Sequence, residues 1–295
     1  MNKTGKFLGC FLPLLAALLC QIVISYGFSL VYGIYMGMKM YKLGITEMAE
    51  QEAYIAENMS SGNLILLITA IATLSTLVVS SLWYRAHKPK TDFSLKEVFN
   101  GKLLAAMAVL GLSLQLLISM CLNAVYPILP QDLTEQYGEL MESLLGGNIW
   151  LSLLVTVILA PLAEEFIFRG ITLKKAQKIM PFMAANILQA VLFGIYHLNW
   201  IQGVYAFVLG MILGFTAEYF HSVWASILLH AFVNGSAEVL SVIPETVTET
   251  YVGVIALALI GVVLLFVAAK LYPHARTAPK VEEKEEFSEI SFDEP

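Results

Sequence analysis

The sequence predicts an all-α, polytopic membrane protein with about eight transmembrane helices and both termini in the cytoplasm. Three observations support this fold class. The mean hydropathy is +0.74. Only 14% of the 295 residues are charged, whereas a soluble globular domain has about 25% charged residues. Apolar runs of the length that a helix needs to cross a bilayer, about 20 residues, recur along the chain.

Eight apolar segments account for the predicted helices. We expect the first to stay attached to the protein, because it is too long for the apolar region of a signal peptide and no small-residue cleavage site closes it early. Polar or charged stretches separate most of the others. In order, the segments run from about Phe7 to Met38, Asn63 to Tyr84, Leu103 to Val125, Asn148 to Leu173, Pro181 to Trp200, Gly203 to Phe220, Ser222 to Leu240 and Tyr251 to Tyr272.

The basic residues predict the orientation. With eight spans, both termini lie on one side of the membrane, and 15 of the 17 Lys and Arg residues fall on that side; the other two are Lys39 and Lys42. Because cytoplasmic segments carry the excess of Lys and Arg, we expect the termini in the cytoplasm. One missed helix would scramble this distribution, so it also supports the count of eight. No internal repeat is evident, which argues against an inverted-repeat transporter.

The fourth apolar segment carries three charged residues, Glu164, Glu165 and Arg169. Even on the mildest insertion scale, a charge at the centre of a bilayer costs about 2.5–3.5 kcal/mol, so we interpret these residues as a site. Glu165 precedes Arg169 by four residues, which is the favourable order for an ion pair within a helix. Glu164 then lies about 100° around the helix and is free to face another group. The alternative is a structural ion-pair network between helices.

Two further polar pairs lie inside apolar segments. Phe193 and His197 are four residues apart in the fifth segment, and His230 and Asn234 are four residues apart in the seventh. At 1.5 Å per residue, the acidic pair, His230 and Asn234 lie near mid-depth of a core of about 30 Å, whereas His197, about 24 Å from the start of its helix, fits least well. Taken alone, each pair could simply bond to a neighbouring helix. Glu238, four residues after Asn234, either extends the polar face or lies at the outer interface.

A carboxylate and two imidazoles that converge in a low-dielectric pocket suit two mechanisms of peptide-bond hydrolysis. In the first, Glu164 is a general base that takes a proton from water and one histidine orients that water. His230 and Asn234 then donate hydrogen bonds to the oxyanion of the tetrahedral intermediate. In the second, Glu164, His197 and His230 bind a Zn²⁺ ion with an open fourth position. The residues alone leave both mechanisms open.

Signatures of other membrane proteases are missing from the sequence. It contains no His-Glu-x-x-His, the motif of a site-2-type zinc protease, and no Gly-x-Ser-x-Gly. Its three aspartates, Asp92, Asp132 and Asp293, all lie outside the predicted spans. The sequence therefore excludes an aspartyl dyad within the membrane.

The order of the three polar motifs resembles that of the type II CAAX prenyl endopeptidases and the related bacteriocin-processing and immunity proteins, the CPBP or Abi family. The motifs are Glu-Glu-x-x-x-Arg at 164–169, Phe-x-x-x-His at 193–197 and His-x-x-x-Asn at 230–234. A single Glu-Glu-x-x-x-Arg would be weak evidence, but three motifs on separate membrane helices are specific. The resemblance covers about Asn148 to Leu240.

The resemblance implies an intramembrane endopeptidase. It implies Glu164 as the activating base, working with His197 on the water, and His230 and Asn234 as the oxyanion site. The supporting residues are Glu165, Arg169 and Phe193. The family is often called a metalloprotease family, and a metal-free glutamate mechanism has been argued for its eukaryotic branch, so the resemblance leaves Zn²⁺ undecided.

We expect four parts in the chain. Residues 1–147 form helices one to three with their loops, 148–240 the catalytic core of helices four to seven, 241–272 the last helix, and 273–295 an acidic, disordered tail. We expect a multi-pass protein of the cell membrane whose active site faces the cytoplasmic half. Its expected partners are membrane lipid and a membrane-associated peptide or protein substrate, either prenylated or bacteriocin-like, and no nucleic acid.

Two other classes of protein fit the same residues. One is a non-proteolytic membrane protein that gives bacteriocin immunity or controls a partner by binding it. The other is a proton-coupled transporter in which Glu164 and the histidines form a relay. A protease predicts that Glu164→Gln abolishes function while the protein still inserts and folds. A binding protein predicts that the change is tolerated. A transporter predicts an activity that depends on a proton gradient.

Overall fold

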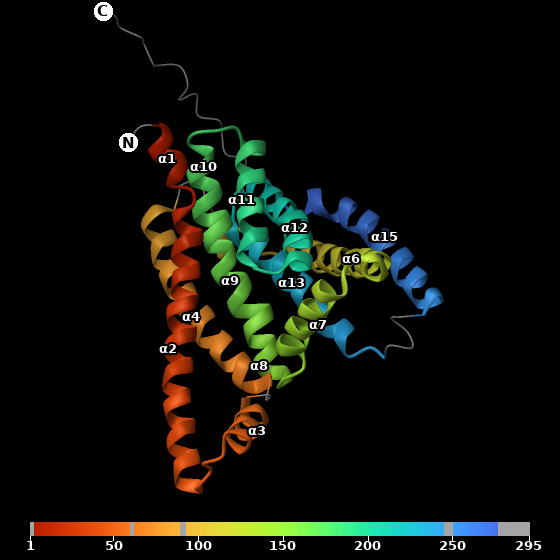
Figure 1. The fold of residues 1–295 in the computed structure, drawn as a ribbon. Helices are drawn as coiled ribbons and strands as arrows, with labels where there is room; N and C mark the ends of the chain where they lie inside the picture. Colours follow the sequence, from red (N-terminus) through yellow and green to blue (C-terminus); the bar gives the residue numbers. More distant parts are fainter. Residues whose placement is uncertain (1–2, 60–61, 89–92, 245–249, 277–295) are drawn as a thin grey trace, which may run out of the picture.

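All eight predicted apolar segments are helical in the computed structural model (Figure 1). The structure describes residues 3–59, 62–88, 93–244 and 250–276, and within these ranges it contains helices and turns but no strand. The all-α prediction is therefore confirmed. Of the acidic tail predicted for 273–295, residues 277–295 lie outside the described ranges, and the division of the chain into four parts stays a prediction.

Seven helices of the described residues are long and apolar enough to cross a membrane. These are α1 with α2 (Lys3–Leu8, Leu12–Leu43), α4 (Gly62–His87), α6 (Gly101–Val125), the column α8–η2–α9–η3–α10 (Ile149–Leu153, Leu154–Leu159, Ala160–Glu165, Phe166–Leu173, Lys174–Gln177), α12 (Trp200–Tyr219), α13 (Val223–Ser241) and α15 (Tyr251–His274). The eighth, α11 (Phe182–Tyr196), has 15 residues, which is about 22 Å and shorter than the core of a bilayer. The chain is a multi-pass membrane protein.

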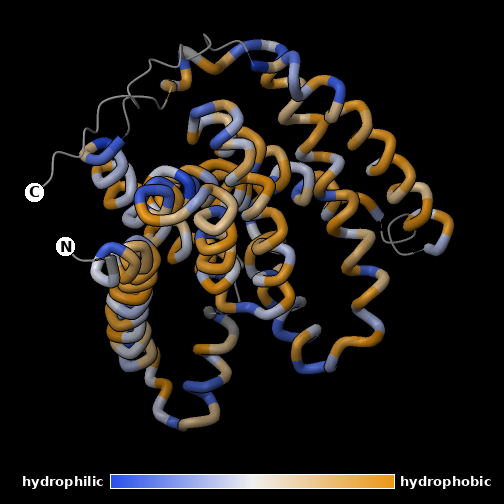
Figure 2. The backbone as a smooth tube through the Cα atoms, turned by 90° about the horizontal axis from the view of Figure 1, so that it is seen from above, coloured by the Kyte–Doolittle hydropathy of each residue, from blue (hydrophilic) through white to orange (hydrophobic). Residues whose placement is uncertain are grey.

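The outer surface of the helices is apolar, as a membrane requires. Figure 2 shows hydrophobic residues along the lengths of the helices and hydrophilic ones gathered mainly at their ends. On α15, for example, Val252, Leu259, Val263 and Phe266 are all more than half exposed. A soluble monomer rarely exposes so large an apolar face, so we assign this face to lipid.

Two helices lie in segments that sequence analysis treated as polar connections. These are α3 (Met48–Met59) and α7 (Gln131–Leu145), and shorter turns occur at α5 (Leu95–Val98) and η1 (Tyr126–Ile128). The ring of Tyr137 on α7 packs edge-on against Tyr205 of α12, with centroids 6.4 Å apart. Burial raises the pKa of the Tyr137 phenol. Because acidic residues recur along α7 and none of its residues is fully buried, it lacks the long apolar run from which the other helices were predicted.

The column from Ile149 to Gln177 is the helix that carries the acidic pair (Figure 1). The side chain of Asn148 caps its start by accepting hydrogen bonds from the main-chain N–H groups of Trp150 and Leu151. Two π-helical stretches, η2 and η3, flank the α-helical turn α9. Wide π turns are rare and often accompany functional sites.

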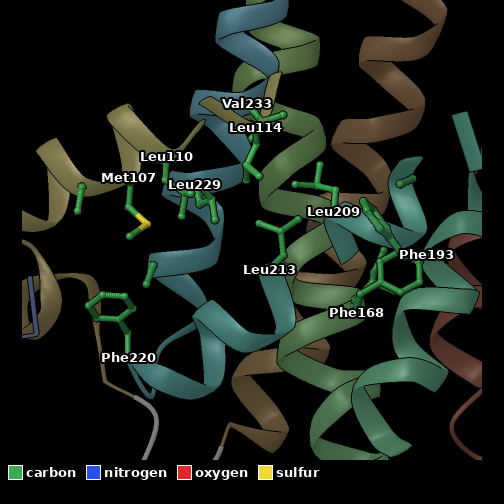
Figure 3. Close-up of a cluster of buried hydrophobic side chains, with 14 of the residues drawn as sticks. Met107, Leu110, Leu114, Phe168, Phe193, Leu209, Leu213, Phe220, Leu229 and Val233 are labelled. Carbon is green, nitrogen blue, oxygen red and sulfur yellow. The ribbon is translucent and has the colours of Figure 1, made fainter. Parts of the chain in front are cut away.

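A continuous apolar core packs α6, α11, α12 and α13 around this column. Figure 3 shows Phe168 of η3 beside Phe193 of α11, with ring centroids 5.1 Å apart. Helices α6 and α13 approach very closely at Gly111, where a Cβ atom would lie only 2.6 Å from the Cβ of Phe232. This close packing fixes α13, which carries His230 and Asn234, against α6.

Candidate active site

The buried carboxylate of Glu165 is the centre of the polar cluster. Its Oε1 accepts hydrogen bonds from Nη1 of Arg169, at 2.8 Å, and from Nδ1 of His230, at 2.9 Å. The Glu165 and Arg169 side chains are fully buried. The predicted ion pair within the helix is therefore confirmed, and the same oxygen also ties α13 to α9.

Glu164 faces the other nitrogen of the same imidazole. Its Oε2 lies 3.8 Å from Nε2 of His230, and the Glu164 side chain is 12% exposed. Since Nδ1–H of His230 donates to Glu165, the ring is held with Nε2 towards Glu164. The separation is too long for a direct hydrogen bond but allows one water molecule to contact both atoms.

Phe193 connects the second motif to this cluster. Its ring lies under the guanidinium of Arg169, 4.4 Å from Cζ, and packs edge-on against the rings of His230, at 5.8 Å, and His197, at 4.8 Å. Nδ1 of His197 donates to the main-chain oxygen of Phe193 at 2.8 Å. The Nε2 atom of His197 consequently carries the ring's lone pair and can accept a hydrogen bond.

The depth of His197 agrees with that of Glu164 better than the sequence suggested. The column extends as far as Gln177 and α11 begins only at Phe182. Counted from these ends at 1.5 Å per residue, Glu164 lies about 20 Å deep and His197 about 22 Å deep. The depth predicted from the sequence was counted from helix ends that differ from these two.

Asn234 contacts the column through a main-chain carbonyl. Its Nδ2 donates to the oxygen of Thr156 at 2.8 Å. The N–H of Ala160 bonds to the oxygen of Val155, five residues back. In the same pattern the oxygen of Thr156 would pair with residue 161, but Pro161 has no N–H. Pro161 thus leaves this carbonyl oxygen available to Asn234, whose Nδ2 keeps a second hydrogen for another acceptor.

Sequence analysis missed a buried amide pair that supports Arg169. Nη2 of Arg169 and Nε2 of Gln189 both donate to the main-chain oxygen of Gly210, at 3.1 and 2.9 Å. Gln189 also donates to Oδ1 of Asn186 at 2.7 Å. Both amide side chains are fully buried. A small residue is needed on α12 here, since a Cβ atom at Gly214 would overlap Asn186.

The first membrane helix also contacts the site, which the sequence did not indicate. Nε2 of Gln21 on α2 donates to the hydroxyl of Tyr196 at 2.5 Å. Tyr196 precedes His197 and packs against Phe168, with ring centroids 5.5 Å apart. A single glutamine in an apolar run gave no signal from which this contact could be predicted.

An apolar groove of about 520 Å³ lies between α11 and α12. The two helices cross at Gly194 and Gly203, where a Cβ on Gly194 would lie 2.6 Å from the oxygen of Gly203. The groove is lined by Val191, Gly194, Ile195, Leu198, Asn199, Trp200, Gly203, Val204 and Phe207. Its lining is almost entirely apolar, so it suits a hydrocarbon chain.

The donor set expected for Zn²⁺ is Glu164, His197 and His230. Glu164 and His230 face one another, and His197 packs against Phe193. Across the described ranges, no three His, Cys, Asp or Glu side chains form a group that could hold a metal ion. The zinc mechanism therefore stays a prediction.

The fold and the site define a polytopic membrane protein with a buried carboxylate–histidine centre. Residues 146–236 match the family model described as type II CAAX prenyl endopeptidase Rce1-like. This match includes all three motifs and confirms the resemblance drawn from them. The family that this model describes is one of endopeptidases. No curated protein and no solved structure matched the chain.

Proposed function

We propose that this protein is an intramembrane endopeptidase that hydrolyses a peptide bond near the C-terminus of a membrane-associated substrate. The observation that carries the proposal is the 3.8 Å separation of Oε2 of Glu164 from Nε2 of His230. A water molecule in contact with both atoms would lie beside a carboxylate base and an imidazole in a largely desolvated pocket.

The proposed mechanism uses both ring nitrogens of His230 as donors. Nδ1–H donates to Glu165, and Nε2–H points towards Glu164 and the water.

The proposed reaction begins with attack by water. Nε2 of His197 accepts a hydrogen bond from the water and orients it, and Glu164 takes a proton as the water oxygen bonds to the carbonyl carbon. Nε2–H of His230 and the second Nδ2 hydrogen of Asn234 donate to the oxyanion. Glu164 then gives its proton to the leaving nitrogen as the carbon–nitrogen bond breaks, which returns the carboxylate to its resting state.

Other buried residues hold this geometry. Glu165 fixes the ring of His230 through Nδ1. Arg169 balances the charge of Glu165, and the ring of Phe193 packs against the guanidinium of Arg169. The apolar groove between α11 and α12 would receive the hydrocarbon part of the substrate, such as a prenyl group. We place the protein in the cell membrane with the site open towards the cytoplasmic half, on the evidence of the Lys and Arg distribution.

The test uses purified protein in liposomes and a quenched peptide with a farnesylated CAAX terminus, beside the same peptide without the lipid. We expect wild-type protein to cleave the farnesylated peptide and His230→Ala to lose at least about 100-fold in kcat. Retained cleavage in the presence of a zinc chelator supports the glutamate mechanism, whereas its loss supports the zinc mechanism. Failure to cleave either peptide would overturn the proposal in favour of a binding-only protein.

A further inference from the structure

Glu238 is a second buried acid, two helical turns from His230 on α13. Glu238 is only 3% exposed. Oε1 accepts hydrogen bonds from Oγ of Ser152 at 2.5 Å and from Oγ1 of Thr156 at 2.8 Å. None of the ion pairs formed by the described residues includes Glu238. Glu238 is therefore buried within the protein, beside Ser152 near the start of the column.

Glu238 and Asn234 share one partner, Thr156. Thr156 contacts Glu238 through its hydroxyl and Asn234 through its main-chain oxygen, at 2.8 Å in each case. Since His230, Asn234 and Glu238 are spaced by four residues, they lie on one face of α13. Ser152 and Thr156 have the same spacing on the facing helix. Their hydrogen bonds to Glu238 and Asn234 therefore form a continuous row between the two helices that ends next to His230.

We propose that Glu238 is a positioning residue that sets the amide of Asn234 through Thr156. The oxygen that Asn234 contacts belongs to the wide turn η2, which ordinary α-helical hydrogen bonds do not hold at Pro161. By binding the hydroxyl of Thr156, Glu238 fixes this turn against α13. Because the oxygen of Thr156 is then held in place, the Nδ2 group that binds it is also held, and its second hydrogen points towards the oxyanion.

The consequence for catalysis rests on the proposed function. Removal of an oxyanion donor lowers kcat by about 100- to 1,000-fold. Glu238 acts one step further away, so we expect loss of its acceptor oxygen to lower kcat by about 10-fold, since small misplacements reduce rates steeply. KM should change by less than about twofold, because Glu238 does not contact the substrate groove.

The test is a double-variant cycle between Glu238→Leu and Asn234→Ala in the full-length protein. Glu238→Leu removes the acceptor, and we expect it to lower kcat about 10-fold alone but not in the Asn234→Ala background. Glu238→Gln keeps an acceptor oxygen and should stay within about threefold of wild type. Ser236→Ala is the control, because the hydroxyl of Ser236 bonds only to its own helix, at the oxygen of Phe232.

A second readout needs no substrate. If Glu238 and Asn234 are coupled through Thr156, the melting temperature of the double variant should fall by less than the sum of the decreases in the two single variants. Thr156→Val, which removes only the hydroxyl, should show the same coupling if Glu238→Leu fails to fold. Additive effects in either variant, or a Glu238→Gln protein as impaired as Glu238→Leu, would overturn the inference. A coupled but proteolytically inactive wild type would overturn the proposed function instead and leave the coupling supported.

Discussion

Arg169→Met should destabilise the protein strongly because it removes the buried guanidinium that pairs with the carboxylate of Glu165. Breaking a buried ion pair by removing one partner costs about 3–5 kcal/mol. We expect the lower end, about 3 kcal/mol, because Nδ1 of His230 stays bonded to the same Glu165 oxygen, at 2.9 Å. The oxygen of Gly210 also keeps a donor, since Nε2 of Gln189 lies 2.9 Å away.

The double variant Glu165→Gln/Arg169→Met separates charge from packing. It removes both charges and keeps an acceptor for His230, so it should recover most of the lost stability. The assay is unfolding in mixed micelles by titration with sodium dodecyl sulfate, followed by circular dichroism. A double variant no more stable than Arg169→Met, or a loss of less than about 1 kcal/mol in the single variant, would refute the reasoning.

Two further predictions concern packing and the wide turn. Gly111→Ala should lower the free energy of unfolding by about 1–3 kcal/mol, because the new Cβ meets Phe232 at 2.6 Å; Gly101→Ala, with no atom within 4 Å of its Cβ, is the control and should change little. Pro161→Ala restores an N–H that competes with Asn234 for the carbonyl oxygen of Thr156. We therefore expect kcat to fall with KM unchanged. A kcat of the Pro161→Ala variant equal to that of wild type would contradict this account.

The positions of the membrane helices and of the ion pair followed from the sequence. Apolar runs set the eight segments, since lipid requires each span to be apolar. The spacing of Glu165 and Arg169 placed both on one face of a helix. The bond from Glu165 to His230 could not be derived in the same way, because it depends on how α9 and α13 cross.

The supporting contacts were not predictable from the sequence. Gln189, Asn186 and Gln21 are single amides in apolar runs, and Gln189 binds a main-chain oxygen that has no residue signature. The role of Thr156 arises from a proline five residues later and from the π-helical pattern, neither of which periodicity reveals. Helix α7 was missed because acidic residues interrupt its sequence throughout, so it does not resemble a membrane span.

The measurement that tests the central claim most directly is the rate of peptide cleavage by Glu164→Gln relative to wild type in liposomes. Gln has the shape of Glu but cannot accept a proton from water. We predict that kcat falls by at least about 100-fold, the contribution of a general base, while the melting temperature stays close to that of wild type. Cleavage by the correctly folded Glu164→Gln protein at the wild-type rate would contradict the assignment of Glu164 as the base.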